Sequence, residues 1–423
     1  MRILLAHKFF RIIGGDAVFF HETGRILRER GHEVAYFSTM NEHEAYDKNY
    51  SYPDENLFFG KAVNYTNSGI VSKIFKLPSL IHSNENKRLM KEAIRKFKPD
   101  LIHCFAIFTT LTPSIMEAAR EEGIPVLLLQ QDYKMICPNY KLFHHGHLCE
   151  DCKGGKFYNA ILNKCCQDST AFSVASAIES YVQQWKNMVR KNVDLLIFSS
   201  RFMADKTTEF WKEKMLPFEI LHNPFNSPSF SVSTITNNYF VFTGRLVPEK
   251  GVDILLQAMN QVKTSAKLLI VGDGIMKDEL QMQTEKLGLT NIEFAGAKWG
   301  DELKKIVSES RFVVVPSIWH ENFPFVVCEA FAQGKAVIGS NRGGIPELIC
   351  DGEYGFTYEG DDSTVLAKHI DFLWNNLEKA KEMGAAAKKF ADEKFNEDVF
   401  YTELMKIYSG ALSSNASKKK LAV

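Results

Sequence analysis

Residues 312–347 contain two copies of one pattern, and this pattern places the tightest limit on the fold. Each copy is a short apolar run, then a polar turn, then a residue series that suits a helix. The apolar runs are residues 312–315 and 336–339. Apolar runs of this length separated by helices are typical of buried parallel strands. We therefore expect an open parallel sheet, which binds ligands in the turns at the carboxyl ends of its strands.

Both turns carry residues that suit a ligand site. Glu321 lies in the first turn, and Glu329 follows eight positions later on the helix. Gly343 and Gly344 form the second turn, with Glu347 beyond it. Carboxylates at two depths can reach two ends of one hydroxyl-rich ligand, and glycines let backbone N–H groups approach a charged one.

The same alternation of strands and helices occupies most of the chain in two series. A turn-rich stretch of residues 222–238, rich in Pro, Ser, Thr and Asn, separates the series. We predict an α/β protein with two Rossmann-like, doubly wound parallel-sheet domains that face each other across a cleft. The predicted boundaries are 1–224 for the N-terminal domain, 225–238 for the linker and 239–395 for the C-terminal domain. Residues 396–423 follow as a helix with a disordered tail.

Composition excludes some classes of function. A chain of 423 residues suits two domains, and its 51 basic residues equal its 51 acidic ones, which gives no argument for nucleic acid. No apolar run reaches 18 residues, and the first ten residues suit a strand better than a signal peptide. We expect a cytoplasmic chain.

Residues 72–98 carry eight Lys and Arg residues among apolar ones. A basic helix of this kind can lie on an anionic membrane, which would place the chain peripherally on the inner face. It can equally be the solvated face of a helix.

Five of the eight cysteines fall within residues 137–166. Cys149 and Cys152 form a C-x-x-C pair, and Cys137 with Cys166 or its neighbour Cys165 would complete four ligands. Tetrahedral zinc takes four such soft ligands, and metal binding suits a cytosolic chain better than disulfides do. The alternatives are unliganded thiols and a redox pair.

The second series opens with a turn that carries two cations. Arg245 and Lys250 follow the predicted strand 240–243 and its Gly244, and Gly272 ends the next strand. Two cations beside a helix N-terminus would hold a diphosphate leaving group and offset its developing charge. The other interpretation is two surface cations beside a turn.

The first series opens with Gly14 and Gly15 directly after its first strand. This turn suits a phosphate or sugar near a helix N-terminus, although it can also be a turn without function. Neither domain opens with G-x-G-x-x-G, so a nucleotide-dependent oxidoreductase is a poor interpretation.

Taken together and in this order, these motifs resemble the retaining glycosyltransferases of family 4, also called group 1, which have the GT-B fold. The resemblance covers nearly the whole chain. The cysteine-rich insertion, with Asp132 and Tyr133 ahead of Cys137, resembles a subgroup that builds surface polysaccharides. The resemblance implies a nucleotide-sugar donor, a glycan acceptor that is lipid-linked, no catalytic metal, and a C-terminal helix that returns to the N-terminal domain.

The resemblance also assigns roles to residues. Arg245 and Lys250 would hold the diphosphate of the donor, and Glu329 would bond the ribose hydroxyls. Glu321 would hold hydroxyls of the donor sugar. The remaining contacts would come from the backbone N–H groups of Asn322 and Phe323 and from the turns at Gly14, Gly15, Gly244 and Gly272.

One position departs from the family pattern. Relatives carry His-x-His on the strand that is 102–105 here, whereas this chain has His103 and then Phe105. Gln131 also stands where relatives often have His. His103 is then the candidate catalytic histidine on the acceptor side. The alternative is a catalytically silent GT-B protein that binds a nucleotide-sugar or glycan and scaffolds partners.

Overall fold

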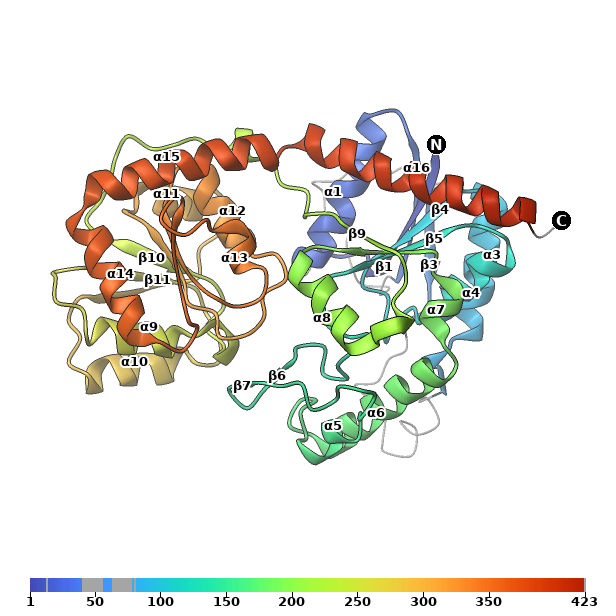
Figure 1. The fold of residues 1–423 in the computed structure, drawn as a ribbon, viewed down its shortest axis with the longest axis horizontal. Coiled ribbons are helices and arrows are strands. Elements are labelled where there is room, and N and C mark those ends of the chain that lie inside the picture. Colours follow the sequence, from blue (N-terminus) through green and yellow to red (C-terminus); the bar gives the residue numbers. More distant parts are fainter. Residues whose placement is uncertain (13, 40–55, 63–77, 80, 422–423) are drawn as a thin grey trace. The chain divides into compact units, whose positions relative to one another are not determined.

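The computed structural model describes residues 1–12, 14–39, 56–62, 78–79 and 81–421, with side chains up to residue 414. The chain forms two compact units. The first comprises Met1–Lys141, Glu150–Pro224 and Phe400–Val423, and the second comprises Leu142–Cys149 and Phe225–Val399. Figure 1 shows the elements of both units.

The first unit is built on a parallel sheet of seven strands in the order β3-β2-β1-β4-β5-β8-β9. Its central strands are apolar on both faces because helices cover both faces. The strands are β1 (Arg2–Phe9), β2 (Glu33–Thr39), β3 (Leu57–Gly60), β4 (Leu101–Cys104), β5 (Val126–Gln130), β8 (Leu195–Phe198) and β9 (Phe218–Ile220).

Serine caps begin three of the helices of this unit. The side chains of Ser83, Ser169 and Ser200 accept hydrogen bonds from backbone N–H groups in the first turns of α3, α6 and α8. The helices are α1 (Gly15–Glu29), α3 (Asn84–Phe97), α4 (Ser114–Glu121), α5 (Asn159–Leu162), α6 (Thr170–Trp185), α7 (Met188–Asn192), α8 (Arg201–Trp211) and the 3-10 turn η2 (Lys212–Lys214).

The second unit has a parallel sheet of six strands in the order β12-β11-β10-β13-β14-β15. Side chains of β10 alternate between two cores, with Phe240 and Phe242 in one and Val241 in the other. The strands are β10 (Phe240–Thr243), β11 (Leu268–Val271), β12 (Ile292–Gly296), β13 (Val313–Val315), β14 (Val337–Ser340) and β15 (Gly355–Tyr358), and the hairpin β6 (Phe143–His144) and β7 (His147–Leu148) is grouped with this unit.

Helices cover both faces of the second sheet. They are α9 (Val252–Met259), α10 (Lys277–Lys286), α11 (Gly300–Glu309), α12 (Phe325–Ala332), α13 (Ile345–Leu348), α14 (Ser363–Asn375) and α15 (Leu377–Lys394), with the 3-10 turns η3 (Ser227–Ser229) and η4 (Pro248–Lys250). No helix in the described part of the chain combines the length and the apolar character needed to cross a membrane.

The last helix, α16 (Glu397–Leu421), packs against the core of the first unit from Phe400 onward. Its buried residues Phe400, Leu404, Tyr408 and Ala411 follow one face of the helix. The ring of Phe400 lies 5.8 Å from that of Phe19 on α1. The helix continues beyond residue 409, where the sequence pattern ended it.

In each sheet the strand order reverses at one point. The reversal lies between β1 and β4 in the first unit and between β10 and β13 in the second. Ligands of doubly wound sheets bind at the carboxyl ends of the strands at this point. The turns after β1, β10 and β13 are therefore the places to look for a site.

Candidate functional site

An ion pair joins the two turns at the reversal point of the second unit. Lys250 lies on η4, after β10, and its Nζ is 2.6 Å from Oε1 of Glu321 in the turn after β13. The hydroxyl of Ser317 donates to the same oxygen at 2.7 Å. Glu321 is only 7% exposed. The structure therefore brings together two residues that are 71 positions apart in the sequence.

The carboxylate of Glu321 is stabilised in its ionised form. Burial alone would raise its pKa, but the charge of Lys250 and hydrogen bonds from Lys250, Ser317 and Trp319 lower the pKa below the usual glutamate value. The Lys250 ammonium also lies 5.9 Å from the centre of the Trp319 ring. A fixed cation therefore stands at this strand end.

Two glycines allow the turns to approach each other. Gly251 has φ +64° and Gly343 has φ +63°, both in the left-handed region. A Cβ at Gly251 would fall on the carbonyl oxygen of Pro316, and one at Gly343 on that of Glu321. The amide of Gly344 donates to the same Glu321 carbonyl at 2.6 Å. The loop that carries Glu321 is thus held from both sides.

Arg245 supplies a second cation in the turn after β10. Its side chain is exposed, and its guanidinium has no ion-pair or hydrogen-bond partner among the described residues. Gly244 precedes it, and the amide of Gly244 donates to Val271 at 3.0 Å. Gly272, at the end of β11, lies against Gly244. An unpaired guanidinium beside such a turn can bind an anion.

Glu329 lies on α12 and is mostly enclosed. Burial raises its pKa to about 7, and the charge of Lys304 offsets this only in part. Within the described residues its carboxylate accepts no hydrogen bond, because Gln333 bonds its backbone carbonyl instead. The side chain is half-buried rather than closed to solvent. Hydroxyl groups of a ligand can therefore reach its carboxylate.

Asn322 and Phe323 follow Glu321 directly. Phe323 is buried, and its ring makes edge contacts with the rings of Phe325 and Phe395 at 6.1 and 5.6 Å. Phe323 thus anchors the turn in the core of the unit, and Asn322 is half-buried beside it.

Gly14 and Gly15 of the first unit lie at the start of α1, with Gly14 in the N-cap position. Sequence reasoning missed their polar neighbours. Lys8 Nζ is 3.0 Å from Oδ2 of Asp16, and His7 Nε2 is 3.4 Å from the same oxygen. The signal was available, since His7 and Lys8 belong to the carboxyl end of β1.

The pKa of Asp16 reflects this arrangement. Burial would raise the pKa, but the hydrogen bond from His7 and the charge of Lys8 lower it well below the usual range. Burial raises the pKa of Asp132, which lies after β5, and the charges of Lys8 and Asp16 also act on this carboxyl. These groups make the reversal point of the first unit polar.

The structure places His103, the candidate catalytic histidine, in the core of the first unit. His103 is fully buried on β4, and its Nδ1 is 2.8 Å from the hydroxyl of Tyr408 on α16. Burial lowers its pKa to about 3, so the ring is neutral. Phe105 stacks on it with ring centres 4.4 Å apart. Both residues are buried, and Nε2 of His103 has no hydrogen-bond partner among the described residues.

The cysteines of the candidate metal set lie in two groups. Cys137, Cys152 and Cys166 are buried in the first unit. A hydrogen bond with Cys166 raises the pKa of Cys165, with burial and the nearby Cys137 and Cys152 adding to the effect. Cys149 ends the hairpin segment that is grouped with the second unit, where it offers a sulfur within 4.8 Å of a ring nitrogen of His144.

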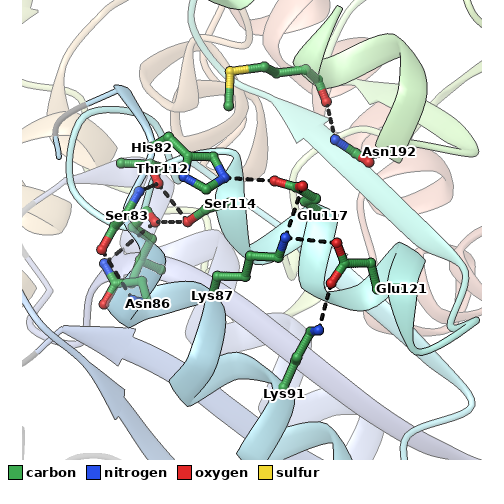
Figure 2. A network of polar contacts seen from close by, with 12 residues as sticks. His82, Ser83, Asn86, Lys87, Lys91, Thr112, Ser114, Glu117, Glu121 and Asn192 are labelled. Carbon is green, nitrogen blue, oxygen red and sulfur yellow. Dashed lines mark hydrogen bonds and ion pairs between the residues drawn. The ribbon is translucent and has the colours of Figure 1, made fainter. Parts of the chain in front are cut away.

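The basic stretch 72–98 lies partly outside the described residues, which resume at 78–79 and from 81. Some of its described cations on α3 pair with acids of α4, as Lys87 and Lys91 do (Figure 2), whereas Arg88 pairs with Glu85 and Glu92 of α3 itself. Lys87 bonds Glu117 at 2.9 Å and Glu121 at 2.7 Å, and Lys91 bonds Glu121 at 2.6 Å. Arg95 pairs with Glu122 at 2.8 Å. These charges therefore stabilise the contact between two helices.

Comparison with known proteins shows which family the second unit is similar to. The sequence profile described as "Glycosyl transferases group 1" matches residues 229–390. An uncharacterized glycosyltransferase of Methanocaldococcus jannaschii is 31% identical over 217 residues, which are 51% of this chain and 60% of that protein. The O-antigen chain mannosyltransferase C of Escherichia coli is 27% identical over 236 residues, which are 53% and 63% of the two chains. These matches thus span less than two thirds of either relative.

The fold is similar to solved structures over its full length. HepE of Anabaena, solved in complex with UDP, superposes with a TM-score of 0.68 at 18% identity, covering 97% of this chain and 100% of that one. Sucrose-phosphate synthase of Thermosynechococcus elongatus superposes with a TM-score of 0.70 at 17% identity, covering 98% and 100%. The predicted GT-B fold with two Rossmann-like units is confirmed.

Proposed function

Residues 229–390 belong to the glycosyl transferases group 1 family, and from this premise we propose that the chain is a retaining glycosyltransferase. It transfers a sugar from a nucleoside diphosphate sugar to a glycan acceptor on a lipid carrier. The reaction serves cell-surface polysaccharide biosynthesis and takes place on the cytoplasmic side. The names of relatives that act on lipopolysaccharide and O-antigen support this assignment.

The observation that carries the proposal is the set of charges at the reversal point of the second unit. An open guanidinium at Arg245, a cation fixed by Glu321 at Lys250, and a hydrogen-bond-deficient carboxylate at Glu329 occupy one sheet edge. These groups suit a nucleoside diphosphate sugar. Its diphosphate can bind the two cations, and the hydroxyl groups of its two sugars can donate to the carboxylate.

Each residue has a role in this reaction. Arg245 and Lys250 bind the diphosphate and stabilise the charge that it gains as its bond to the sugar breaks. Glu329 accepts hydrogen bonds from the ribose hydroxyls. Glu321 orients Lys250 and, with the backbone N–H groups of Asn322 and Phe323, bonds hydroxyls of the donor sugar. The acceptor hydroxyl then bonds to the anomeric carbon, and its proton passes to the departing diphosphate.

The catalytically silent alternative rested on Phe105. Because Phe105 packs in the core against His103, Phe19 and Phe20, its identity removes no group from a ligand-facing surface. The argument for a silent protein therefore loses its basis, and the transferase remains the function that the geometry supports best.

The test measures release of nucleoside diphosphate from a panel of nucleotide-sugars. We expect Arg245→Ala to lower kcat/KM by about a hundredfold, because it removes charge stabilisation from the transition state. Lys381→Ala is the matched control, since Lys381 is an exposed lysine paired with Glu378 on α15. No binding and no hydrolysis of any panel member would overturn the proposal.

We further propose that the cysteine-rich insertion holds a structural zinc ion. The ligands are Cys137, Cys149, Cys152 and Cys166, with Cys165 as the alternative to Cys166. Burial of three of the four thiols supports a structural site, since such sites are closed to solvent. Elemental analysis of the purified chain and of Cys149→Ser and Cys165→Ser variants tests the set. Less than half an equivalent of zinc in the parent chain would contradict it.

A further inference from the structure

Exposed large apolar side chains are concentrated in one part of the first unit. Of the thirteen such residues in the described chain, seven fall between residues 140 and 185. They are Tyr140, Tyr158, Leu162, Phe172, Ile178, Tyr181 and Trp185. A concentration of this kind on one segment marks an interaction surface rather than scattered exposure.

Helix α6 presents these residues as one stripe. Val174, Ile178, Tyr181 and Trp185 are spaced by four, three and four residues, which places them on the same face of a helix. Ile178 is 37% exposed, Tyr181 40% and Trp185 80%, while Val174 is partly exposed. We call these four residues the α6 stripe.

The opposite face of α6, which points into the protein, is polar or small. It carries Ser173, Ala177, Glu179 and Ser180, all buried. A helix in a globular protein normally buries its large apolar side chains and exposes its polar ones. In α6 the arrangement is the reverse, because large apolar side chains are exposed and the buried side chains are polar or small.

Specific polar contacts hold α6 in this orientation. Glu179 is almost fully buried and forms an ion pair of 2.8 Å with the equally buried Lys134. Lys134 also donates to the carbonyl of Pro138 at 3.2 Å, and the hydroxyl of Ser173 accepts from the amide of Cys166 at 3.1 Å. Rotating the helix to bury the stripe would expose or break these contacts, so the stripe is a fixed feature of the surface.

Neighbouring α5 extends the apolar face. The two helices pack against each other, as the green segments of Figure 1 show. The hydroxyl of Tyr181 accepts from the amide of Tyr158 at 3.1 Å, and the ring of Tyr181 lies 5.1 Å from that of Phe157. Tyr158 itself is exposed. Tyrosine and tryptophan side chains thus dominate this face.

The charges of this segment favour an anionic partner. Lys156, Lys164, Lys186 and Lys191 are all exposed within residues 156–191. Asp168 is the exposed acid of this range, because Glu179 is buried against Lys134. An exposed apolar stripe with aromatic residues and flanking lysines matches the composition of helices that lie in a membrane interface.

We propose that the α6 stripe docks the first unit onto an anionic lipid bilayer. Trp185 enters the interface with its apolar ring and leaves its indole N–H at the headgroups, and Ile178 adds apolar area beside it. The flanking lysines bind the lipid phosphates. On α3, by comparison, the cations Lys87 and Lys91 are paired with acids of α4 (Figure 2). The proposal does not depend on sugar transfer.

The experiment measures flotation of the full chain with vesicles of phosphatidylcholine alone and of phosphatidylcholine mixed equally with phosphatidylglycerol. We expect binding to the anionic vesicles. The double variant Ile178→Ser/Trp185→Ser should lose about tenfold or more in binding, because it removes apolar area from the interface. Lys164→Glu/Lys186→Glu should weaken binding to the anionic vesicles selectively.

Trp299→Ser is the matched control, since Trp299 is a 77% exposed tryptophan on the second unit. Arg95→Gln on α3 is the control for charge. Both should bind as the parent chain does. Brominated lipids should quench the fluorescence contributed by Trp185, measured as the difference between the parent and Trp185→Phe.

Three results would overturn the proposal. They are no binding of the parent chain to either vesicle, equal binding of the parent and the stripe variant, and a parent dimer that the stripe variant converts to a monomer without vesicle binding. The last result would assign the stripe to a second copy of the chain. Nucleoside diphosphate binding, measured on the same variants without vesicles, separates a failure here from a failure of the proposed function.

Discussion

Lys250 and Glu321, 71 residues apart, form a 2.6 Å ion pair that ties the turn after β10 to the turn after β13. Since β10 and β13 flank the point where the strand order reverses, the pair fixes the two loops that a ligand would contact. Glu321 is more deeply buried than Lys250, so the carboxylate depends on the ammonium more than the reverse. The same contact serves stability and positions a cation.

The first prediction concerns the energy of this pair. We expect Lys250→Ala to destabilise the second unit by about 2–4 kcal/mol, because it leaves a buried carboxylate without its cation. Glu321→Ala should cost less, since Lys250 can turn toward water. The double variant should lose about 1–3 kcal/mol less than the sum of the single variants. Denaturant unfolding of the four chains measures this coupling.

A more exposed ion pair in the same unit is the control for the double-mutant cycle at Lys250 and Glu321. Lys298, which precedes α11, and Glu302 on α11 are 2.6 Å apart but more exposed, so their coupling should stay below about 1 kcal/mol. Additive losses at Lys250 and Glu321 would mean that the pair does not hold the loops together.

The second prediction concerns the contact between Gly343 and the Glu321 loop. Gly343→Ala should destabilise the second unit by about 2–4 kcal/mol, because it adds a steric clash with the Glu321 carbonyl to the strain of a left-handed residue. Gly352→Ala has the same kind of φ, +78°, but its Cβ would meet no atom within 4 Å. It should cost about 1 kcal/mol. Thermal unfolding distinguishes the two, and equal losses would exclude the clash.

The residues of the second unit could be located from the sequence because the local pattern determines them. In a parallel sheet the turn after each strand lies at the ligand edge, so Arg245, Lys250 and Glu321 could be placed once the strands were recognised. Glu329 followed from its helical spacing after Glu321. No long-range contact had to be known to locate these four residues.

The features that the sequence does not reveal depend on long-range contacts. His103 lies near the carboxyl end of β4, and its side chain packs against Tyr408, 305 residues away. Period-two alternation cannot tell which face of a buried strand a distant helix will cover. The inverted face of α6 likewise depends on Lys134, which lies 45 positions before Glu179 and has no signal in the helix itself.

The third prediction follows from the buried position of His103. Tyr408→Phe should lower the stability of the first unit by about 1 kcal/mol, because it removes the hydrogen bond to His103. Since the folded pKa of His103 is about 3, the unfolded chain takes up the proton first. The stability of the parent chain should therefore fall as the pH drops below about 6.5, and His103→Gln should weaken this dependence.

The turnover number of a His103 variant tests separately whether this histidine takes part in catalysis. With the ring enclosed in the core, His103→Gln should keep kcat within about threefold of the parent, apart from any loss of folded protein. A fall of about a hundredfold in a chain that stays folded would restore the histidine to the catalytic set.

The last prediction joins stability and binding at Glu329. Its folded pKa of about 7 lies above the usual glutamate pKa of 4.5, so the unfolded chain releases this proton first as the pH rises. Stability should then be highest below about pH 4.5 with respect to this group and decline toward pH 7. Glu329→Gln removes the decline and should stabilise the second unit by about 1–3 kcal/mol at pH 8.

The same substitution should weaken nucleoside diphosphate binding about tenfold, because an amide accepts hydrogen bonds from ribose hydroxyls less well than a carboxylate does. In the parent chain, affinity should rise as the pH passes through about 7, where Glu329 ionises. In Glu329→Gln the rise should be smaller, because only the terminal phosphate of the ligand then ionises in this range. Asp301→Asn, at a fully exposed acid on α11, should alter neither quantity. Calorimetric titration with UDP and GDP at pH 6 and pH 8 measures both effects. A variant that gains stability while binding as tightly as the parent would remove Glu329 from the ligand site, because its burial would then have no functional counterpart.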